Sequence, residues 1–409
     1  MHVVYIHQYF TTPDQKGGTR SYEMARRLVQ AGHRVTMIGG TTDLIGVDAS
    51  AGGTKREQVD GIDVIRILEP YSNAMSFGRR WMTFLKFARK AYKVARTLED
   101  VDLVFATSTP LTVGDPGRKA ARYHKCPFVF EVRDLWPELP IAMGLVGNPL
   151  IKMYLKRMEL RAYRAADRIV ALAPGIKQGI CQTGYPEDRV AMIPNSSDVD
   201  LFKPAESNEE VDQDPRFGRP GDFRLTFTGA HGLANGLDAV LDAIGILKQR
   251  NVEGVRFVFI GNGGLKPHLQ QRAKDEGLDD YISWIDPIKK KELARILPQM
   301  DAGMTILKNV PAFYRGTSPN KFFDYLACGL PILNNYPGWV GEYIEEAKCG
   351  KVVPPDDPEA FADAVTDLMR GKEELPAMGA NARRLAEQEF SRDLLGRQFV
   401  EVLEEAARS

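Results

Sequence analysis

The sequence predicts an α/β protein of two facing Rossmann-like domains with a cleft between them. Short β-branched runs alternate with helical patterns along most of the 409 residues, which is typical of doubly wound parallel sheets. That length is more than one hydrophobic core usually serves. The alternation also stops at an acidic stretch, AESNEEVDQDPRFGRPGD, which we interpret as a linker or exposed loop, and restarts after it.

We therefore divide the chain into residues 1–203, 204–385 and 386–409. The first part contains strand-like runs such as HVVYIH, HRVTMI and FVFEV, with helices predicted over Arg20–Ala31 and Arg79–Leu98. The second contains RLTFTG, RFVFIG and LPILNN. Open parallel sheets bind ligands beyond the carboxyl ends of their strands, so two such domains predict a ligand site at their facing edges.

The composition narrows the class of protein. Residues 1–203 carry 29 Lys and Arg against 21 Asp and Glu, and the remainder carries 25 against 33, which suggests different partners for the two halves. No apolar run approaches the roughly 18 residues of a membrane span. The N-terminal MHVVYIHQYF lacks a basic region, so we interpret it as a first strand and not a signal peptide. The cysteines have no metal or redox spacing, as expected of free thiols in the cytoplasm: Cys126, Cys181, Cys328 and Cys349.

Glycine-rich turns follow predicted strands in both halves. Two of them occur in successive βα units of the second half, which favours a nucleotide phosphate as ligand, although neither matches the Walker or the dinucleotide pattern. In the first half, the turn before the helix that Thr19 would cap is either an anion-binding loop or an ordinary flexible turn. The residues are Gly17 and Gly18, then Gly229, Gly232 and Gly236, then Gly261, Asn262, Gly263 and Gly264.

The stretch RGTSPNKFFDYLACGLPIL predicts a short helix with an anion at its start. Thr317 or Ser318 would cap it, Pro319 would take the first helical position, and Gly329 would end it. Lys321 is unfavourable in the first turn by about 0.3–1 kcal/mol unless an anion binds there. With Arg315 it would flank a diphosphate, and Asp324 would accept the hydroxyls of a ribose. A surface Lys321–Asp324 ion pair is the alternative.

Taken together, these motifs resemble the family-4 glycosyltransferases of GT-B architecture almost from end to end. The resemblance rests on QKGGTRSYEMARRLVQAGHRV, VAMIPNSSDVDLFKP, DYLACGLPIL and CGKVVPPDDPEAFADAV, and NARRLAEQEFSRDLL matches final helices that return to the N-terminal domain. FVFEVRDLWPELP and TGAHGLANGLDAVLDA further resemble a bacterial subgroup similar to fucosaminyltransferases of surface-polysaccharide assembly.

The resemblance implies a retaining, metal-independent transfer from a nucleotide-diphospho-sugar, most simply UDP-linked, to a lipid-linked saccharide. It assigns the acceptor to residues 1–203 and the donor to residues 204–385. One candidate sugar is an N-acetylated 6-deoxyhexosamine. One alternative is a sugar-nucleotide epimerase on the same fold, which would need no acceptor. The other is an inactive scaffold, because Gly316 replaces the first of the family's paired glutamates, and Ala230 and Asn235 replace its Arg and Lys. Sugar contacts then pass to Thr317, Ser318 or Asn320.

Further residues are ambiguous. Asp134 matches the aspartate of a family His-Asp pair, with Arg133 replacing the histidine; a structural Arg133–Glu138 interaction is the alternative. His231 either donates to a phosphate or sugar oxygen or belongs to the turn, and His7 is expected to support packing. The DQD and DVD triplets resemble metal motifs, yet helix N-termini and cations leave no need for a metal, and no cofactor is expected.

A basic, aromatic helix predicts docking to an anionic membrane. FGRRWMTFLKFARKAYKVARTL has no acidic residue, and LIKMYLKRMELRAYRAADR adds further cations. Anionic lipid attracts such cations by about 1 kcal/mol each, and aromatic side chains settle at headgroups. Nucleic acid is not expected as a partner. The protein would be cytoplasmic and peripheral on the inner face of the membrane, with these contacts: Arg79, Arg80, Trp81, Phe84, Lys86, Arg89, Lys90 and Lys93.

Overall fold

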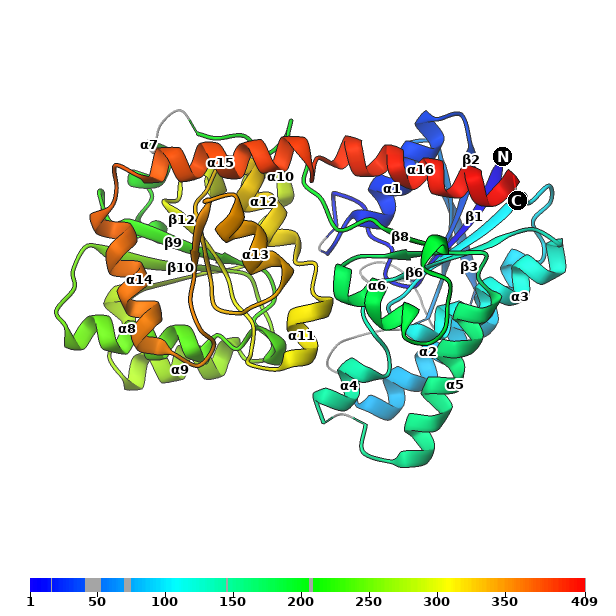
Figure 1. The fold of residues 1–409 in the computed structure, drawn as a ribbon, viewed down its shortest axis with the longest axis horizontal. Helices are drawn as coiled ribbons and strands as arrows, with labels where there is room; N and C mark the ends of the chain where they lie inside the picture. The colour runs from blue at the N-terminus through cyan, green and yellow to red at the C-terminus, as the bar shows by residue number, and fades with distance from the viewer. Residues whose placement is uncertain (16, 41–52, 70–74, 145, 206–208, 409) are drawn as a thin grey trace. The chain divides into compact units, whose positions relative to one another are not determined.

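The computed structural model describes all residues except 16, 41–52, 70–74, 145, 206–208 and 409 (Figure 1). The described chain forms two compact units. Unit 1 comprises Met1–Pro194 with Leu395–Ser409, and unit 2 comprises Asn195–Leu394. Each unit contains one sheet, with its helices packed around it (Figure 1). The prediction of two Rossmann-like domains built on parallel sheets is confirmed.

In the described part of unit 1, the sheet has eight strands in the order β3-β4-β2-β1-β5-β6-β7-β8, and among these strand pairs only β3–β4 is antiparallel. Every residue of β1, β5 and β6 is buried, as expected for parallel strands covered on both faces. The strands are β1 (His2–His7), β2 (Arg34–Gly40), β3 (Thr54–Val59), β4 (Ile62–Ile67), β5 (Leu103–Thr107), β6 (Phe128–Val132), β7 (Arg168–Ala171) and β8 (Val190–Met192). The helices are α1 (Arg20–Gln30), α2 (Phe77–Ala95), α3 (Gly114–His124), α4 (Glu138–Ala142), α5 (Pro149–Ala165) and α6 (Pro174–Cys181).

Helix α16 (Arg392–Arg408) begins in unit 2 and supplies its later residues to unit 1. The ring of Phe399 lies 5.0 Å from that of Phe105 and 6.5 Å from that of Tyr5, so the end of the chain completes the core beneath β1 and β5. The sequence divided the chain after residues 203 and 385. The structure changes unit after Pro194 and Leu394.

The sheet of unit 2 has six parallel strands in the order β11-β10-β9-β12-β13-β14. Its strands are β9 (Phe223–Thr228), β10 (Val255–Ile260), β11 (Ile282–Ile285), β12 (Ala302–Thr305), β13 (Ile332–Asn334) and β14 (Gly350–Val352). Its helices are α7 (Glu209–Asp212), α8 (Asp238–Gln249), α9 (Lys266–Asp275), α10 (Lys290–Ile296), α11 (Pro311–Gly316), α12 (Asn320–Cys328), α13 (Trp339–Glu346), α14 (Pro358–Arg370) and α15 (Leu375–Gln388). Among the described helices, none has the length and apolar character needed to cross a membrane.

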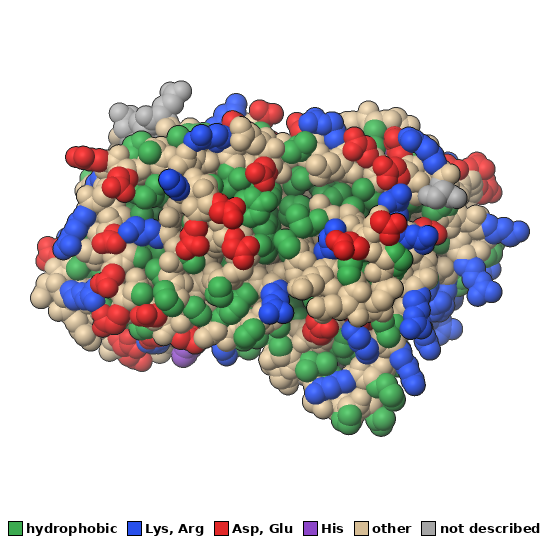
Figure 2. All heavy atoms as spheres, viewed as in Figure 1, with side chains coloured by type: hydrophobic (Ala, Val, Ile, Leu, Met, Phe, Trp, Pro, Cys, Tyr) green, Lys and Arg blue, Asp and Glu red, His purple; other side chains and the backbone are tan. Residues whose placement is uncertain are grey.

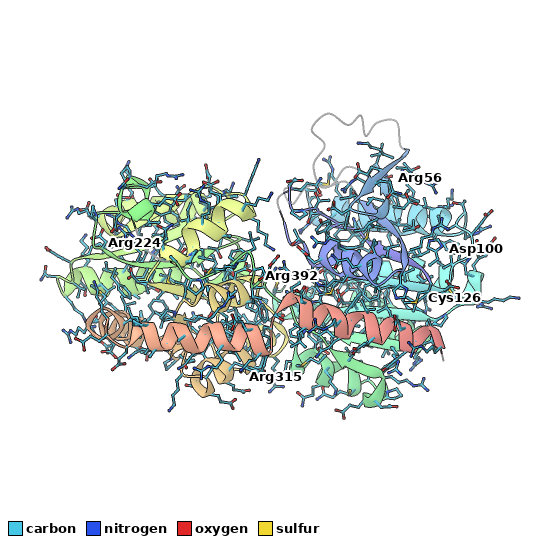
Figure 3. All side chains as sticks on the ribbon, turned by 90° about the horizontal axis from the view of Figure 1, so that it is seen from above. Arg56, Asp100, Cys126, Arg224, Arg315 and Arg392 are labelled. Atoms are coloured by element: carbon cyan, nitrogen blue, oxygen red, sulfur yellow. The ribbon has the colours of Figure 1, made fainter. Side chains whose placement is uncertain are left out.

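The stretch interpreted as a linker is largely part of unit 2, which corrects the sequence interpretation for its described residues. Val211 and Phe217 are both 1% exposed. Arg224 of β9, labelled in Figure 3, is also 1% exposed, and its Nη1 lies 2.7 Å from Asp212 Oδ1. A buried arginine in a strand requires a fixed carboxylate, so this segment folds back onto the sheet.

The glycine-rich turns after β9 and β10 pack backbone against backbone. A Cβ on Gly261 would lie 1.9 Å from Gly229 O, and a Cβ on Gly263 would lie 2.4 Å from His231 O. These two glycines therefore have a packing reason that needs no phosphate. Around Gly232 and Gly264, by contrast, a Cβ would meet nothing within 4 Å.

We expect Gly261→Ala to lower the free energy of unfolding of unit 2 by about 3 kcal/mol, because the added carbon collides with a backbone oxygen that cannot move aside and because Gly261 has a φ of 150°. Equilibrium urea unfolding measures the loss. Gly264→Ala is the matched control and should change stability by less than about 1 kcal/mol. Equal losses in the two variants would contradict the packing argument.

Candidate functional site

In each unit the strand order reverses at one point of the described sheet. In unit 1 the reversal lies between β1 and β5, and in unit 2 between β9 and β12. Such points leave a crevice outside the carboxyl ends of the strands. His7 ends β1 and Ser108 follows β5, while Gly229 follows β9 and Ile306 follows β12. The candidate site residues are therefore considered unit by unit.

The Gly17–Gly18 turn is exposed and is held by one side chain. Thr11 Oγ1 donates to Gly18 O at 3.0 Å. Gly17 has a φ of 132°, which favours glycine. Thr19 occupies the N-cap position of α1, as predicted, but its side chain makes no capping hydrogen bond. The turn presents its backbone to solvent just ahead of a helix start.

The first residue of α1, Arg20, is fixed by a buried network that the sequence did not reveal. Its Nη2 donates to Glu131 Oε2 at 2.8 Å and to Ile193 O at 2.8 Å, and its Nη1 donates to Pro194 O at 2.6 Å. Thr107 Oγ1 donates to the other oxygen of Glu131 at 2.6 Å. The side chains of Arg20 and Glu131 are 3% and 0% exposed. Glu131 is therefore a structural anchor for the helix that follows Gly17 and Gly18.

His7, Arg133 and Asp134 lie together at the carboxyl edge of β1 and β6. Arg133 Nη1 lies 3.4 Å from His7 Nε2, and Arg133 N donates to Ser108 Oγ at 3.0 Å. Burial, reinforced by the charge of Arg133, holds the pKa of His7 well below its usual value, so the ring is neutral. Burial raises the pKa of Asp134, opposed by Arg133 and by a 3.3 Å hydrogen bond from Thr109. Between Arg133 and Glu138, both described residues, there is no ion pair, so that alternative is not observed.

Helix α12 begins one residue later than the sequence predicted, and its start is not capped by a side chain. Pro319 takes the N-cap position and Asn320 the first helical one. Ser318 is used elsewhere: its Oγ accepts from Asn195 N at 3.0 Å and its O from Asn195 Nδ2 at 2.6 Å. The predicted capping by Thr317 or Ser318 is therefore wrong. The first N–H groups of α12 have no side-chain cap and stay available to a bound anion.

Lys321 lies beside the turn after β9 without a carboxylate partner among the described residues. Its Nζ lies 3.9 Å from the centre of the Phe227 ring, 3.5 Å from Asn235 Oδ1, and near Gly229. Burial lowers the pKa of Lys321 to about 7. A partly buried cation with only an aromatic face and an amide oxygen around it is poorly compensated. An anion at this point would compensate it.

The other predicted residues of this segment are only partly brought together with Lys321. Arg315, labelled in Figure 3, is exposed on α11 and has no ion pair in the described part of the chain. Asp324 accepts from Ser197 Oγ at 2.8 Å. Burial raises the pKa of Asp324. The alternative of a Lys321–Asp324 ion pair is wrong, since these two described residues are not paired.

His231 lies under the turn and not on it. Its side chain is fully buried among Phe227, Phe259 and Trp284, and neither ring nitrogen has a hydrogen-bond partner. Burial, with the charges of Lys266 and Lys321, lowers its pKa to about 4, so the ring is neutral. This burial argues against contact of the ring with a phosphate or sugar. The exposed Asn262 accepts from Gly263 N at 2.8 Å and shapes the second turn.

The predicted membrane contacts divide into exposed and buried side chains. Arg79, Lys86, Arg89 and Lys93 are exposed, and Arg80 and Trp81 are partly buried. Two residues do not fit the prediction. Phe84 is 9% exposed and packs inward, and Lys90 Nζ lies 2.5 Å from Glu69 Oε1. The sequence did not reveal these two placements, because helical spacing alone does not say which face of the helix meets the sheet.

Comparison with known proteins gives two family matches. Residues 17–201 match the model of Glycosyltransferase Family 4, and residues 222–371 match that of Glycosyl transferases group 1. One similar protein is the D-inositol 3-phosphate glycosyltransferase of Paenarthrobacter aurescens, 26% identical over 56% of this chain and 55% of that protein. The amylovoran biosynthesis glycosyltransferase AmsK of Erwinia amylovora is 27% identical over 42% of each chain. The matched regions thus span about half the length of these relatives.

Solved structures share the fold over the whole chain. HepE from Anabaena, in complex with UDP-glucose, superposes with a TM-score of 0.73 at 15% identity, over 99% of this chain and 100% of that one. At this identity the likeness shows the fold alone. In the described residues no group of three or more His, Cys, Asp or Glu side chains could hold a metal ion.

We expect Glu131→Gln to lower the free energy of unfolding by about 3–5 kcal/mol, because it leaves the Arg20 guanidinium buried without its counter-charge. Urea unfolding followed by circular dichroism measures this. The matched control is Glu404→Gln, at the partly exposed pair with His33, which should cost less than about 1 kcal/mol. A small loss for both variants would show that Arg20 does not need the charge of Glu131.

Proposed function

We propose that this chain, which belongs to the glycosyltransferases of family 4 with GT-B architecture, transfers a sugar to a lipid-linked saccharide. The donor is a UDP-linked sugar, and the configuration at the anomeric carbon is retained. The observation that carries the donor assignment is Lys321, a partly buried cation at the uncapped start of α12 that has no carboxylate partner within the described part of the chain. A diphosphate offers this ammonium the missing counter-charge and the helix N–H groups their acceptors.

The proposed roles of the donor-side residues follow from the geometry of unit 2. Lys321 and the exposed Arg315 neutralise the diphosphate, and no metal is required. Asn320, Ser318 and the turns at Gly229 and Gly261–Asn262 line the donor. Asp324 accepts the ribose hydroxyls. The ring of His231 is left out of this proposal, because it is fully buried.

The proposed chemistry exchanges one C–O bond for another and transfers one proton. The acceptor hydroxyl oxygen attacks the anomeric carbon while the bond from that carbon to the β-phosphate oxygen breaks. The departing phosphate takes the hydroxyl proton on the same face. Asp134 and Arg133 orient the acceptor, and the Gly17–Gly18 turn contacts the donor with backbone N–H groups. The task of the protein is then orientation and stabilisation of the leaving diphosphate.

Two observations bear on the acceptor. AmsK, similar to part of this chain, is named for amylovoran biosynthesis, which supports an acceptor in polysaccharide assembly. Helix α2 exposes Arg79, Lys86, Arg89 and Lys93 and contains no acidic residue, which supports attachment to an anionic membrane from the cytoplasmic side. The fucosaminyltransferase-like subgroup, and with it an N-acetylated 6-deoxyhexosamine donor, is part of the proposal.

An inactive scaffold and a sugar-nucleotide epimerase are the competing functions, and Gly316, Ala230 and Asn235 in place of the family's charged residues favour the first of these. Incubation with a panel of labelled nucleotide sugars, with and without bacterial lipid extract, separates the three. Label transferred to lipid supports the proposal. Epimerised donor, or binding without chemistry, rejects it.

In the same assay we expect Lys321→Ala to lower turnover by about 100-fold, as does removal of a preorganised group that stabilises a developing anion. The matched control is Lys274→Ala, which removes an exposed lysine of α9 and should leave turnover unchanged. Near-normal turnover of folded Lys321→Ala protein would disprove the assignment of Lys321 to the diphosphate.

Binding of UDP-glucose should weaken as the pH rises above 7. Burial places the pKa of the free Lys321 at about 7, and a bound diphosphate raises it, so the complex holds more protons than the free protein. Affinity is therefore full below the pKa of the free form and falls, by up to about tenfold per pH unit, as pH rises toward that of the complex. Titration calorimetry between pH 7 and 8.5, in two buffers of different ionisation heat, measures the proton uptake. Lys321→Ala should abolish it, and an uptake that persists in that variant would assign the proton elsewhere.

A further inference from the structure

A groove runs along the outer helices of unit 1, between α2 and α5, with α3 as its floor. It encloses about 530 Å³, a volume within the usual range for small-ligand sites of about 300–1,000 Å³. Helix α2 contributes Leu85 and Arg89, α3 contributes Arg118 and Lys119, and α5 contributes Tyr154 and Arg161. The groove therefore combines apolar walls with four cations.

Only some of these cations are neutralised. Asp115, the one carboxylate in the lining, pairs with both Arg118 and Lys119, with its Oδ2 2.6 Å from Lys119 Nζ. Arg89 and Arg161 are exposed and have no ion pair among the described residues. They come from the two opposite walls. A groove with two unpaired guanidinium groups on opposite sides is complementary to a bidentate oxyanion such as a phosphate.

Exposed hydrophobic side chains, called the apolar rim below, are concentrated on α2 and α5, the two helices whose Leu85 and Tyr154 line the groove. Among the described residues, nine large hydrophobic side chains are exposed, and six of them belong to α2 or α5: Met82, Leu85, Leu150, Ile151, Met153 and Tyr154. Leu150 alone is 68% exposed. Figure 2 shows hydrophobic and basic side chains together on the part of unit 1 where Figure 1 draws the start of α5. A soluble anion would gain nothing from this rim.

We propose that the groove between α2 and α5 binds the phosphate group of an anionic membrane lipid, with Arg89 and Arg161 as its donors, while the apolar rim enters the headgroup layer. Guanidinium groups suit phosphate oxygens geometrically, and exposed Leu, Ile, Met and Tyr side chains suit the interface of a bilayer. The inference rests on the proposed membrane-bound function. It adds a specific binding site to that function, because diffuse attraction to any anionic surface would not require a groove.

The test compares two variant pairs of the full-length protein that remove equal charge. Arg89→Gln with Arg161→Gln removes the groove cations, and Lys86→Gln with Lys93→Gln removes two exposed cations of α2 that do not line the groove. Co-sedimentation uses vesicles of phosphatidylcholine alone and with phosphatidylglycerol, at about 0.1 M and about 0.5 M salt, since salt screens diffuse attraction far more than close contacts. Unfolding curves check that both pairs fold.

We expect the lysine pair to lose no more than about 30-fold in binding at low salt, which is the diffuse contribution of two cations. The groove pair should lose at least about tenfold more, together with the binding that persists at high salt. Equal losses in the two pairs, or no binding of the wild type to phosphatidylglycerol vesicles, would overturn the proposal. So would binding of free glycerol phosphate as tight as that of the vesicles, because the occupant would then be a soluble anion.

Rejection of the lipid-phosphate groove can be distinguished from rejection of the proposed glycosyltransferase function. Binding of each nucleotide sugar of the panel by the wild type is measured without vesicles. If that binding is absent for every donor, the glycosyltransferase proposal fails whatever the vesicles show. If it is present and the two variant pairs behave alike, only the lipid-phosphate groove is rejected.

Discussion

The buried contact between Arg20 and Glu131 is the constraint on which the functional edge of unit 1 depends. One guanidinium group joins the start of α1, the end of β6 and the carbonyl groups of residues 193 and 194, where unit 1 ends. Because an unpaired charge at this depth costs several kcal/mol, the segment after Gly17 and Gly18 has few alternative positions. The Gly17–Gly18 turn has a defined position, from which it can contact a ligand, because Arg20 is fixed.

In unit 2 the segments at the carboxyl edge of the sheet are held in place by backbone packing and not by a buried ion pair. Its two glycine turns are locked by backbone contact, with Gly229 against Gly261 and His231 against Gly263. Close packing of this kind leaves no room for side chains and needs no charge. It also leaves Lys321 against an aromatic ring and an amide oxygen, without an acidic neighbour among the described residues. Arg20 of unit 1 and Lys321 of unit 2 thus differ in one physical respect: the buried Arg20 is paired with a carboxylate, and the partly buried Lys321 has no carboxylate partner among the described residues.

That difference distinguishes a charged residue that stabilises the fold from one that is a candidate for ligand binding. Glu131 lies near the carboxyl end of β6, where ligand sites form, yet both of its oxygens are used within the fold. The positive charge of Lys321 is unfavourable near the N-terminus of its helix, and the fold places no carboxylate among the described residues beside it to offset this energy. An ionisable group whose environment stays unfavourable in the folded protein is a better guide to a ligand than its mere position at a strand end.

The sequence by itself determined the fold class, because alternation of β-branched runs and amphipathic helices reflects local periodicity that every residue carries. It also determined the candidate diphosphate site at Lys321, since a cation in a first helical turn is a local conflict visible without coordinates. Only the tertiary structure decided which glycines are needed for packing and that Ser318 bonds to Asn195 and does not cap α12. It also decided that Phe84 packs inward and that Lys90 pairs with Glu69, while Arg89 has no ion pair among the described residues. Those outcomes depend on contacts between segments far apart in the chain, such as Arg20 with Glu131, and no local pattern records which distant group will arrive.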